Sequence, residues 1–81
     1  MNRREYLAAR KPFTPVPGEI YENEGGGHYK YKCLRSWDGA SRMRNVTSGW
    51  DFVAHGCGVY PDGRIDWDYS TDGGFANREE D

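Results

Sequence analysis

Turn-forming residues recur so often after residue 18 that only short strands fit between them. Glycine-rich or small polar turn sequences stand at residues 25–27, 38–39, 48–49, 62–63 and 72–74. Glycine and aspartate favour the tight turns that join antiparallel strands. The segments between these turns alternate apolar and polar residues, which is the pattern of a strand with one buried face. We therefore predict five strands, at residues 19–22, 28–35, 42–47, 50–60 and 64–69.

Aromatic residues predict how these strands are packed. Only 36% of the 81 residues are hydrophobic, but the chain has three Trp, six Tyr and three Phe. Disordered chains carry few aromatic rings, and large rings bury enough surface to build a small core. A flat sheet would leave one aromatic face and two edges exposed, whereas a curled sheet covers them. We predict a mainly β fold, a small five-stranded antiparallel SH3-like barrel over residues 18–76. The alternative is an open sheet packed on the N-terminal helix.

Two details refine this prediction within the strands. Tyr29, Tyr31 and Cys33 alternate with polar residues, which predicts that they point toward the core. Leu34 then interrupts the alternation, which predicts a β-bulge or a strand end buried on both faces. In residues 64–69 the alternation places Trp67 and Tyr69 toward the core.

The first 17 residues follow a different pattern. Asn2 and Glu5 have the spacing of a capping box, which marks the start of a helix. Three prolines between residues 12 and 17 then favour an extended path. We predict an N-terminal arm over residues 1–17, made of a short helix and a proline-rich segment, and an acidic tail at residues 77–81.

The charges are distributed unevenly along the chain. Residues 1–44 hold nine basic and five acidic side chains, and residues 45–81 hold two basic and eight acidic ones. Spaced carboxylates beside an exposed Trp suit a basic groove on a partner protein, because Trp is a frequent interface anchor. Our leading hypothesis is a non-enzymatic protein-binding module. Its acidic face would consist of Asp62, Asp66, Asp68, Asp72, Trp50 and Trp67.

The basic first half supports an alternative hypothesis. Basic side chains from two consecutive predicted strands, with aromatic rings nearby, suit a nucleic acid or a nucleotide, because cations attract phosphates and rings stack on bases. The residues of this alternative are Lys30, Lys32, Arg35, Arg42, Arg44 and Trp37.

Metal binding is a third and weaker alternative. His55 and Cys57 are two residues apart on a predicted strand, so they share a face and supply two ligands of a zinc site, with Cys33 as a third. Neither cysteine has the C-x2-C spacing of a zinc knuckle. We therefore predict no metal, and we also predict no cofactor and no catalytic residue. Because a reducing cytosol keeps cysteines as thiols, we predict no Cys33–Cys57 disulfide.

The chain lacks an apolar run of the length that crosses a membrane and lacks an apolar secretory signal. We therefore expect a cytoplasmic protein that does not bind membranes. The sequence leaves its oligomeric state open.

Three sequence runs carry a resemblance to a known group of proteins. They are Ser-Gly-Trp at 48–50, Ala-His-Gly at 54–56 and Asp-Gly-x-Ile-x-Trp-Asp-Tyr-Ser at 62–70. Over Gly18 to Phe75 the chain resembles small proteins from phages and integrated mobile elements of Gram-positive bacteria. The resemblance implies a location in the bacterial host cell and inhibition of a host defence or nucleic-acid-handling protein. It supplies no catalytic or ligand-binding residue.

Overall fold

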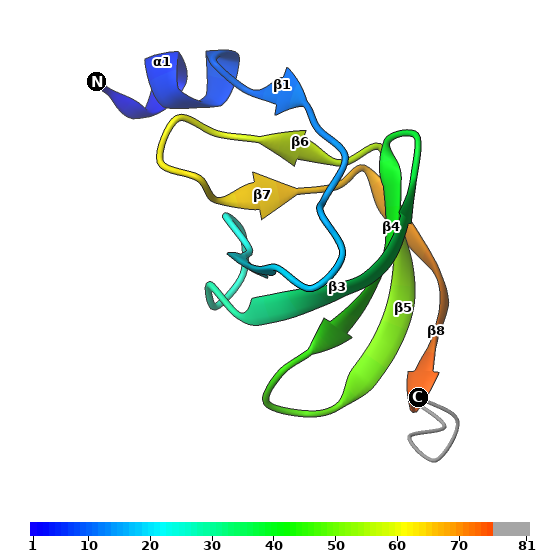
Figure 1. The fold of residues 1–81 in the computed structure, drawn as a ribbon. Helices are drawn as coiled ribbons and strands as arrows, with labels where there is room; N and C mark the ends of the chain where they lie inside the picture. The colour runs from blue at the N-terminus through cyan, green and yellow to red at the C-terminus, as the bar shows by residue number, and fades with distance from the viewer. Residues whose placement is uncertain (76–81) are drawn as a thin grey trace.

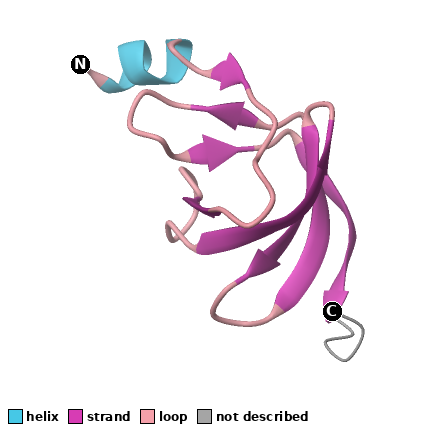
Figure 2. Ribbon diagram, viewed as in Figure 1, coloured by secondary structure: helices cyan, strands magenta, loops and turns pink. Residues whose placement is uncertain are grey.

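The computed structural model describes residues 1–75, which form one short helix and two antiparallel β-sheets (Figures 1 and 2). The helix is α1 (Arg3–Ala8). The smaller sheet has the order β1-β6-β7, with β1 (Lys11–Pro12), β6 (Gly58–Val59) and β7 (Ile65–Asp66). The larger sheet has the order β2-β3-β4-β5-β8, with β2 (Ile20–Glu22), β3 (Lys30–Trp37), β4 (Ala40–Asn45), β5 (Trp50–His55) and β8 (Tyr69–Phe75).

The prediction of a mainly β fold is confirmed, but residues 1–75 form two sheets and no closed barrel. The first three predicted strands are present as β2, β3 and β4 with shifted ends. The last two predicted strands are each divided by a bend. Gly56, with φ of 69°, separates β5 from β6, and Trp67 and Asp68 separate β7 from β8. The two bends face each other, because the Asp68 amide donates a hydrogen bond to the His55 carbonyl.

The predicted arm is packed against the sheets. Its helix begins at the predicted capping box, in which the Asn2 and Glu5 side chains each accept a hydrogen bond from the other residue's amide. After the helix, β1 pairs with β6, and the Phe13 amide donates to the Cys57 carbonyl. Figure 1 shows the arm passing along β6 and then crossing to β2. The predicted tail at residues 77–81 lies outside the described residues.

The core joins both sheets. Its fully enclosed members are Cys33, Met43, Ala54, Cys57 and Ile65, with Phe13, Tyr21, Tyr31, Phe52, Val59 and Trp67 packed around them. Tyr31 and Trp67 meet edge to face, with ring centroids 5.3 Å apart, so the prediction that both point inward is confirmed.

For Tyr29 and Tyr69 the inward prediction is wrong, because they are 55% and 60% exposed. Tyr29 precedes β3 and follows His28, whose φ of 56° turns the chain. Tyr69 follows the bend that separates β7 from β8, so the alternation of residues 64–69 does not continue through it.

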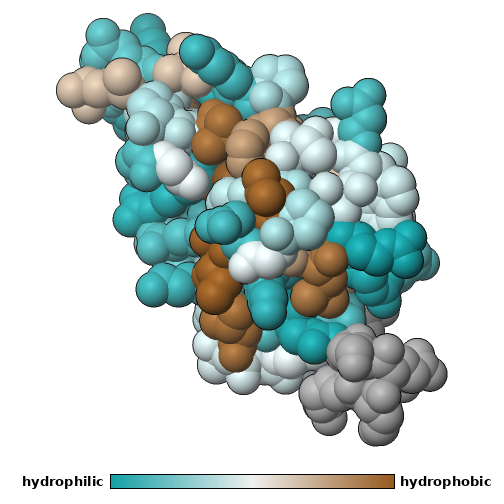
Figure 3. Space-filling view, viewed as in Figure 1, coloured by the Kyte–Doolittle hydropathy of each residue, from teal (hydrophilic) through white to brown (hydrophobic). Residues whose placement is uncertain are grey.

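Some apolar residues remain on the surface. Figure 3 shows apolar side chains gathered in the middle of one face of the molecule. Val16 of the arm and Ile20 of β2 are 51% and 54% exposed. The larger sheet therefore presents apolar as well as polar surface to solvent.

The bend at Gly56 leads to the first prediction. A Cβ atom at Gly56 would clash with the Asp68 carboxylate, whereas a Cβ at Gly63, where φ is also positive, would meet nothing within 4 Å. We expect Gly63→Ala to lower the free energy of unfolding by about 1 kcal/mol through backbone strain alone. Gly56→Ala adds the clash and should cost about 3 kcal/mol. Urea unfolding measures both; equal losses would show that the bend tolerates a side chain.

Candidate nucleic-acid interface

The outer face of the larger sheet is the face turned away from the core. In β4, Ser41 and Met43 are completely buried, and side chains alternate along a strand. Arg42 and Arg44 therefore point to the outer face.

Strand pairing places the basic residues of β3 beside those of β4. Arg44 is opposite Lys32, and Arg42 is opposite Arg35, and residues directly opposite each other share a face. Five basic side chains from two adjacent strands thus lie on the outer face. They are Lys30, Lys32, Arg35, Arg42 and Arg44, the same five that the sequence assigned to the nucleic-acid alternative.

A β-bulge makes this arrangement possible. The register of β3 against β4 shifts between Cys33 and Arg35, as the interruption at Leu34 predicted. Cys33 is completely buried opposite Met43, whereas Arg35 is exposed opposite Arg42. Without the extra residue, Cys33 and Arg35 would point to the same face.

Aromatic side chains form a row at one end of the outer face. Trp37 is opposite Ala40, Ala40 is opposite His55, and His55 is opposite Tyr69. We call Trp37, Ala40, His55 and Tyr69 the aromatic row. The His55 and Tyr69 rings are stacked, with centroids 4.6 Å apart and planes 8° apart. Trp37 is 44% exposed, so the row offers ring surface to solvent at both ends.

The three arginines of the outer face have different partners. The Asp51 carboxylate, only 4% exposed, accepts hydrogen bonds of 2.7 and 3.0 Å from Arg44, and the Arg42 Nε lies 3.9 Å away. The hydrogen bond to Asp51 raises the pKa of Arg44. The Arg35 guanidinium lies 5.3 Å from the centre of the Trp37 ring.

Three of the five cations face solvent. Lys30, Lys32 and Arg35 are exposed, and they form no ion pair with any carboxylate in residues 1–75. Glu22 lies opposite Lys30 at the sheet edge, but its carboxylate accepts a 2.6 Å hydrogen bond from Arg64. The positive charge at this end of the face is therefore uncompensated within the described part of the chain.

The residues of the predicted acidic face are brought together only in part, since Asp66 and Asp68 both lie beside Arg10. Trp67 is packed around the core, Trp50 begins β5, and Asp72 lies on β8. Asp62 and Asp66 lie on or beside the smaller sheet, where the arm contacts them.

The arm supplies hydrogen-bond donors to these carboxylates. Tyr6 donates from its hydroxyl to Asp62 at 2.9 Å, and its ring stacks on Tyr60 with centroids 4.8 Å apart. Arg10 donates to Asp66 at 2.5 Å and lies 3.6 Å from Asp68. The arm therefore offsets the charge that the acidic-face hypothesis needs.

The predicted zinc ligands are used in other contacts. The His55 Nε2 lies 2.6 Å from the Thr71 hydroxyl, and the Cys33 Sγ lies 3.0 Å from the Ser41 hydroxyl. Burial raises the pKa of the Cys57 thiol to about 11. Both cysteines are free thiols, and no three His, Cys, Asp or Glu residues among those the structure describes are grouped to hold a metal ion.

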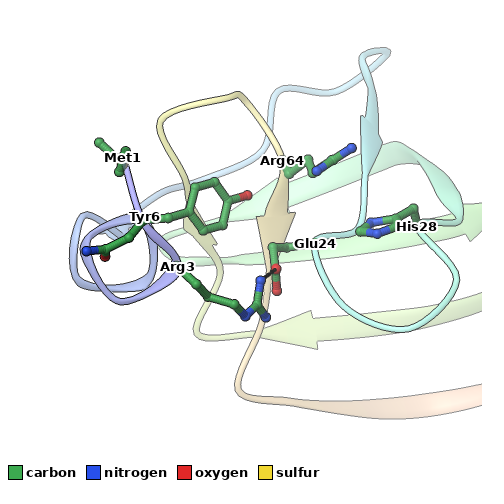
Figure 4. Close-up of a pocket in the computed structure, with 7 residues that line it drawn as sticks. Met1, Arg3, Tyr6, Glu24, His28 and Arg64 are labelled. Carbon is green, nitrogen blue, oxygen red and sulfur yellow. Dashed lines mark hydrogen bonds and ion pairs between the residues drawn. The ribbon is translucent and has the colours of Figure 1, made fainter.

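One open pocket, with a volume of about 300 Å³, lies between α1 and the turn before β3 (Figure 4). It is lined by Met1, Asn2, Arg3, Tyr6, Glu24, His28 and Arg64. Arg3 donates to Glu24 at 3.0 Å, and Arg64 donates to Glu22 at 2.6 Å. The charges of this pocket are thus already paired, in contrast to those of the outer face. No sequence motif links its residues, which come from distant parts of the chain.

Comparisons with protein-family models, curated proteins and solved structures found no match. In residues 1–75 no helix is long and apolar enough to cross a membrane.

Tyr60, whose ring stacks on Tyr6 of the arm, leads to the second prediction. Burial and the 2.6 Å hydrogen bond to Asp66 raise the pKa of Tyr60 to about 12, compared with about 10 for a free Tyr. The folded state therefore disfavours ionisation, and this stabilisation is present below pH 10 and is lost as the pH rises from about 10 to 12. We expect the unfolding free energy of the wild type to fall over this range.

Tyr60→Phe should remove part of that fall, whereas Tyr29→Phe, at an exposed ring, should leave it unchanged. Urea unfolding at a series of alkaline pH values measures the difference. An identical pH dependence in the two variants would contradict the assignment to Tyr60.

Proposed function

We propose that this chain is a non-enzymatic module that binds single-stranded nucleic acid on the outer face of its larger sheet. The observation that carries the proposal is the pairing of β3 with β4, which sets Lys32 beside Arg44 and Arg35 beside Arg42. A row of cations from two adjacent strands attracts a phosphate backbone and releases the counterions bound to it.

The aromatic row favours a single strand over a duplex. Unpaired bases expose flat ring surfaces that stack on aromatic side chains, whereas bases in a duplex are stacked on one another. Trp37 and Tyr69 are exposed on the same face as the five cations. Basic groove and stacking surface together are the usual means by which proteins bind single strands.

The formal net charge of −2 does not oppose this proposal. Several carboxylates of the second half are bonded away from the outer face, since Asp62 receives hydrogen bonds from Tyr6 and Asp66 receives them from Arg10. Local charge decides where a phosphate backbone binds, because salt screens charges beyond about 8–10 Å.

Two further sequence-based predictions fit a small binding module. The resemblance to phage and mobile-element proteins suggests action in a bacterial host cell, where single strands arise during replication and transfer of such elements. The SH3-like general shape also stays a prediction, supported by the sharp bends between β5 and β6 and between β7 and β8. Inhibition of a host nucleic-acid-handling protein would require a partner surface in addition to this face.

A charge-reversal experiment tests the proposed function. We expect the wild type to bind a fluorescent oligothymidine in low salt, with an affinity that falls steeply as salt is added. Lys32→Glu combined with Arg35→Glu should weaken binding about tenfold or more, because both side chains are exposed on the outer face. Fluorescence anisotropy measures the affinity.

The matched control is Arg4→Glu combined with Lys11→Glu, which changes the net charge equally at exposed residues of the arm. In about 0.1 M salt, where charges more than about 10 Å apart are largely screened, this control should lose at most about twofold. Absence of binding by the wild type, or equal losses in the two double variants, would refute the proposal.

A further inference from the structure

The His55–Tyr69 stack shows how these two rings of the aromatic row are oriented. The two residues lie directly opposite each other on neighbouring strands, and such strands are about 4.8 Å apart. Their ring centroids are 4.6 Å apart and their planes differ by 8°. The distance between the ring centroids nearly equals the strand spacing, and the ring planes are nearly parallel. The two ring faces are therefore directed toward the neighbouring strands, which is the direction of the aromatic row.

The face of His55 opposite Tyr69 is therefore directed toward Ala40 and, beyond it, toward Trp37. Ala40 lies on the strand between β3 and β5 and has only a methyl group as its side chain. Trp37 and His55 are two strand spacings apart, which is about 10 Å. The His55 face beside a side chain as small as that of Ala40 favours a flat ring as the ligand.

Cations lie beside this position. Arg35 contacts the Trp37 ring and pairs with Arg42 one row further along the sheet. Residues two apart on one strand are separated by about 7 Å along it. A base that stacks in the aromatic row would thus have its phosphates within reach of the Arg35 and Arg42 side chains.

We propose that the aromatic row is a stacking site for unpaired nucleobases, with His55 as the stacking ring beside Ala40 and Tyr69 supporting His55. Trp37, with Arg35 over its ring, lies on the other side of Ala40. This inference rests on the proposed function and adds to it the part of the ligand that is recognised: the base as well as the phosphate. Exposed Arg35 supplies the neighbouring phosphate contact.

An abasic strand separates base binding from phosphate binding. The probes are an oligothymidine of about eight nucleotides, within the usual length of a single-strand site, and an abasic deoxyribose-phosphate strand with the same number of phosphates. We expect the wild type to bind the oligothymidine about tenfold more tightly than the abasic strand, because each stacked base contributes favourable free energy.

Variants in the aromatic row should reduce this ratio without changing the affinity for the abasic strand. Tyr69→Ala removes the support of His55, and Ala40→Leu fills the position between Trp37 and His55 while keeping every ring and charge. Tyr69→Phe, which keeps the ring, should keep the ratio. Tyr29→Ala is the matched control, since Tyr29 is similarly exposed, at 55% against 60%, but lies outside the row.

The outcomes distinguish the two proposals. Equal binding of both probes by the wild type would overturn the stacking site and leave phosphate binding in place. A base preference that Tyr69→Ala and Ala40→Leu do not alter would also overturn it, because the bases would then stack elsewhere. Absence of binding to either probe would overturn the proposed function itself. A ratio lowered by these two variants and kept by Tyr69→Phe and Tyr29→Ala supports the inference.

Discussion

The pairing of β3 with β4, including its bulge, is the constraint on which both faces of the larger sheet depend. Lys30 and Lys32 have even numbers, whereas Arg35 and Trp37 have odd numbers, so a regular strand would place the two pairs on opposite faces. The extra residue between Cys33 and Arg35 brings all four to the outer face and keeps Cys33 in the core. One extra residue in β3 thus allows Cys33 to be buried on one face while the basic side chains form a continuous surface on the other.

The arm completes the charge distribution that this pairing begins. By sequence, the first half is basic and the second half acidic, and simple pairing of the two halves would leave no excess positive charge. The arm does this only for the smaller sheet, where Arg10 bonds Asp66 and Tyr6 bonds Asp62. The Arg10–Asp66 contact is partly buried, so it contributes more than the fully exposed ion pairs that salt screens. Among the described residues, the cations of β3 have no carboxylate partner, so the outer side of β3 is basic within this part of the chain.

Local patterns predicted the parts of the fold that depend on neighbours in sequence. The capping box, the bulge at Leu34 and the inward positions of Tyr31 and Trp67 all follow from alternation or spacing within a few residues. The acidic face could not be judged in this way, because the arm bonds to Asp66 across 56 residues of chain. The exposure of Tyr69 depends on a bend that only the contact between residues 55 and 68 reveals. Pairing between residues far apart in sequence decides how the charged side chains are arranged, and local patterns do not show it.

The buried Asp51 divides the cations of the outer face into two kinds. Arg42 and Arg44 are two residues apart on one strand and would repel each other, and the carboxylate between them offsets that repulsion and fixes the Arg44 guanidinium through two hydrogen bonds. Lys30 and Lys32 have no such fixed geometry, and their flexible stems can follow phosphates in several positions. Arg44, fixed by Asp51, lies opposite the flexible Lys32, so the outer face offers a phosphate backbone both a fixed donor and adaptable ones. Such a surface suits a ligand whose backbone conformation varies. This is the requirement for binding single strands of many sequences, since stacking and phosphate contacts are common to all of them.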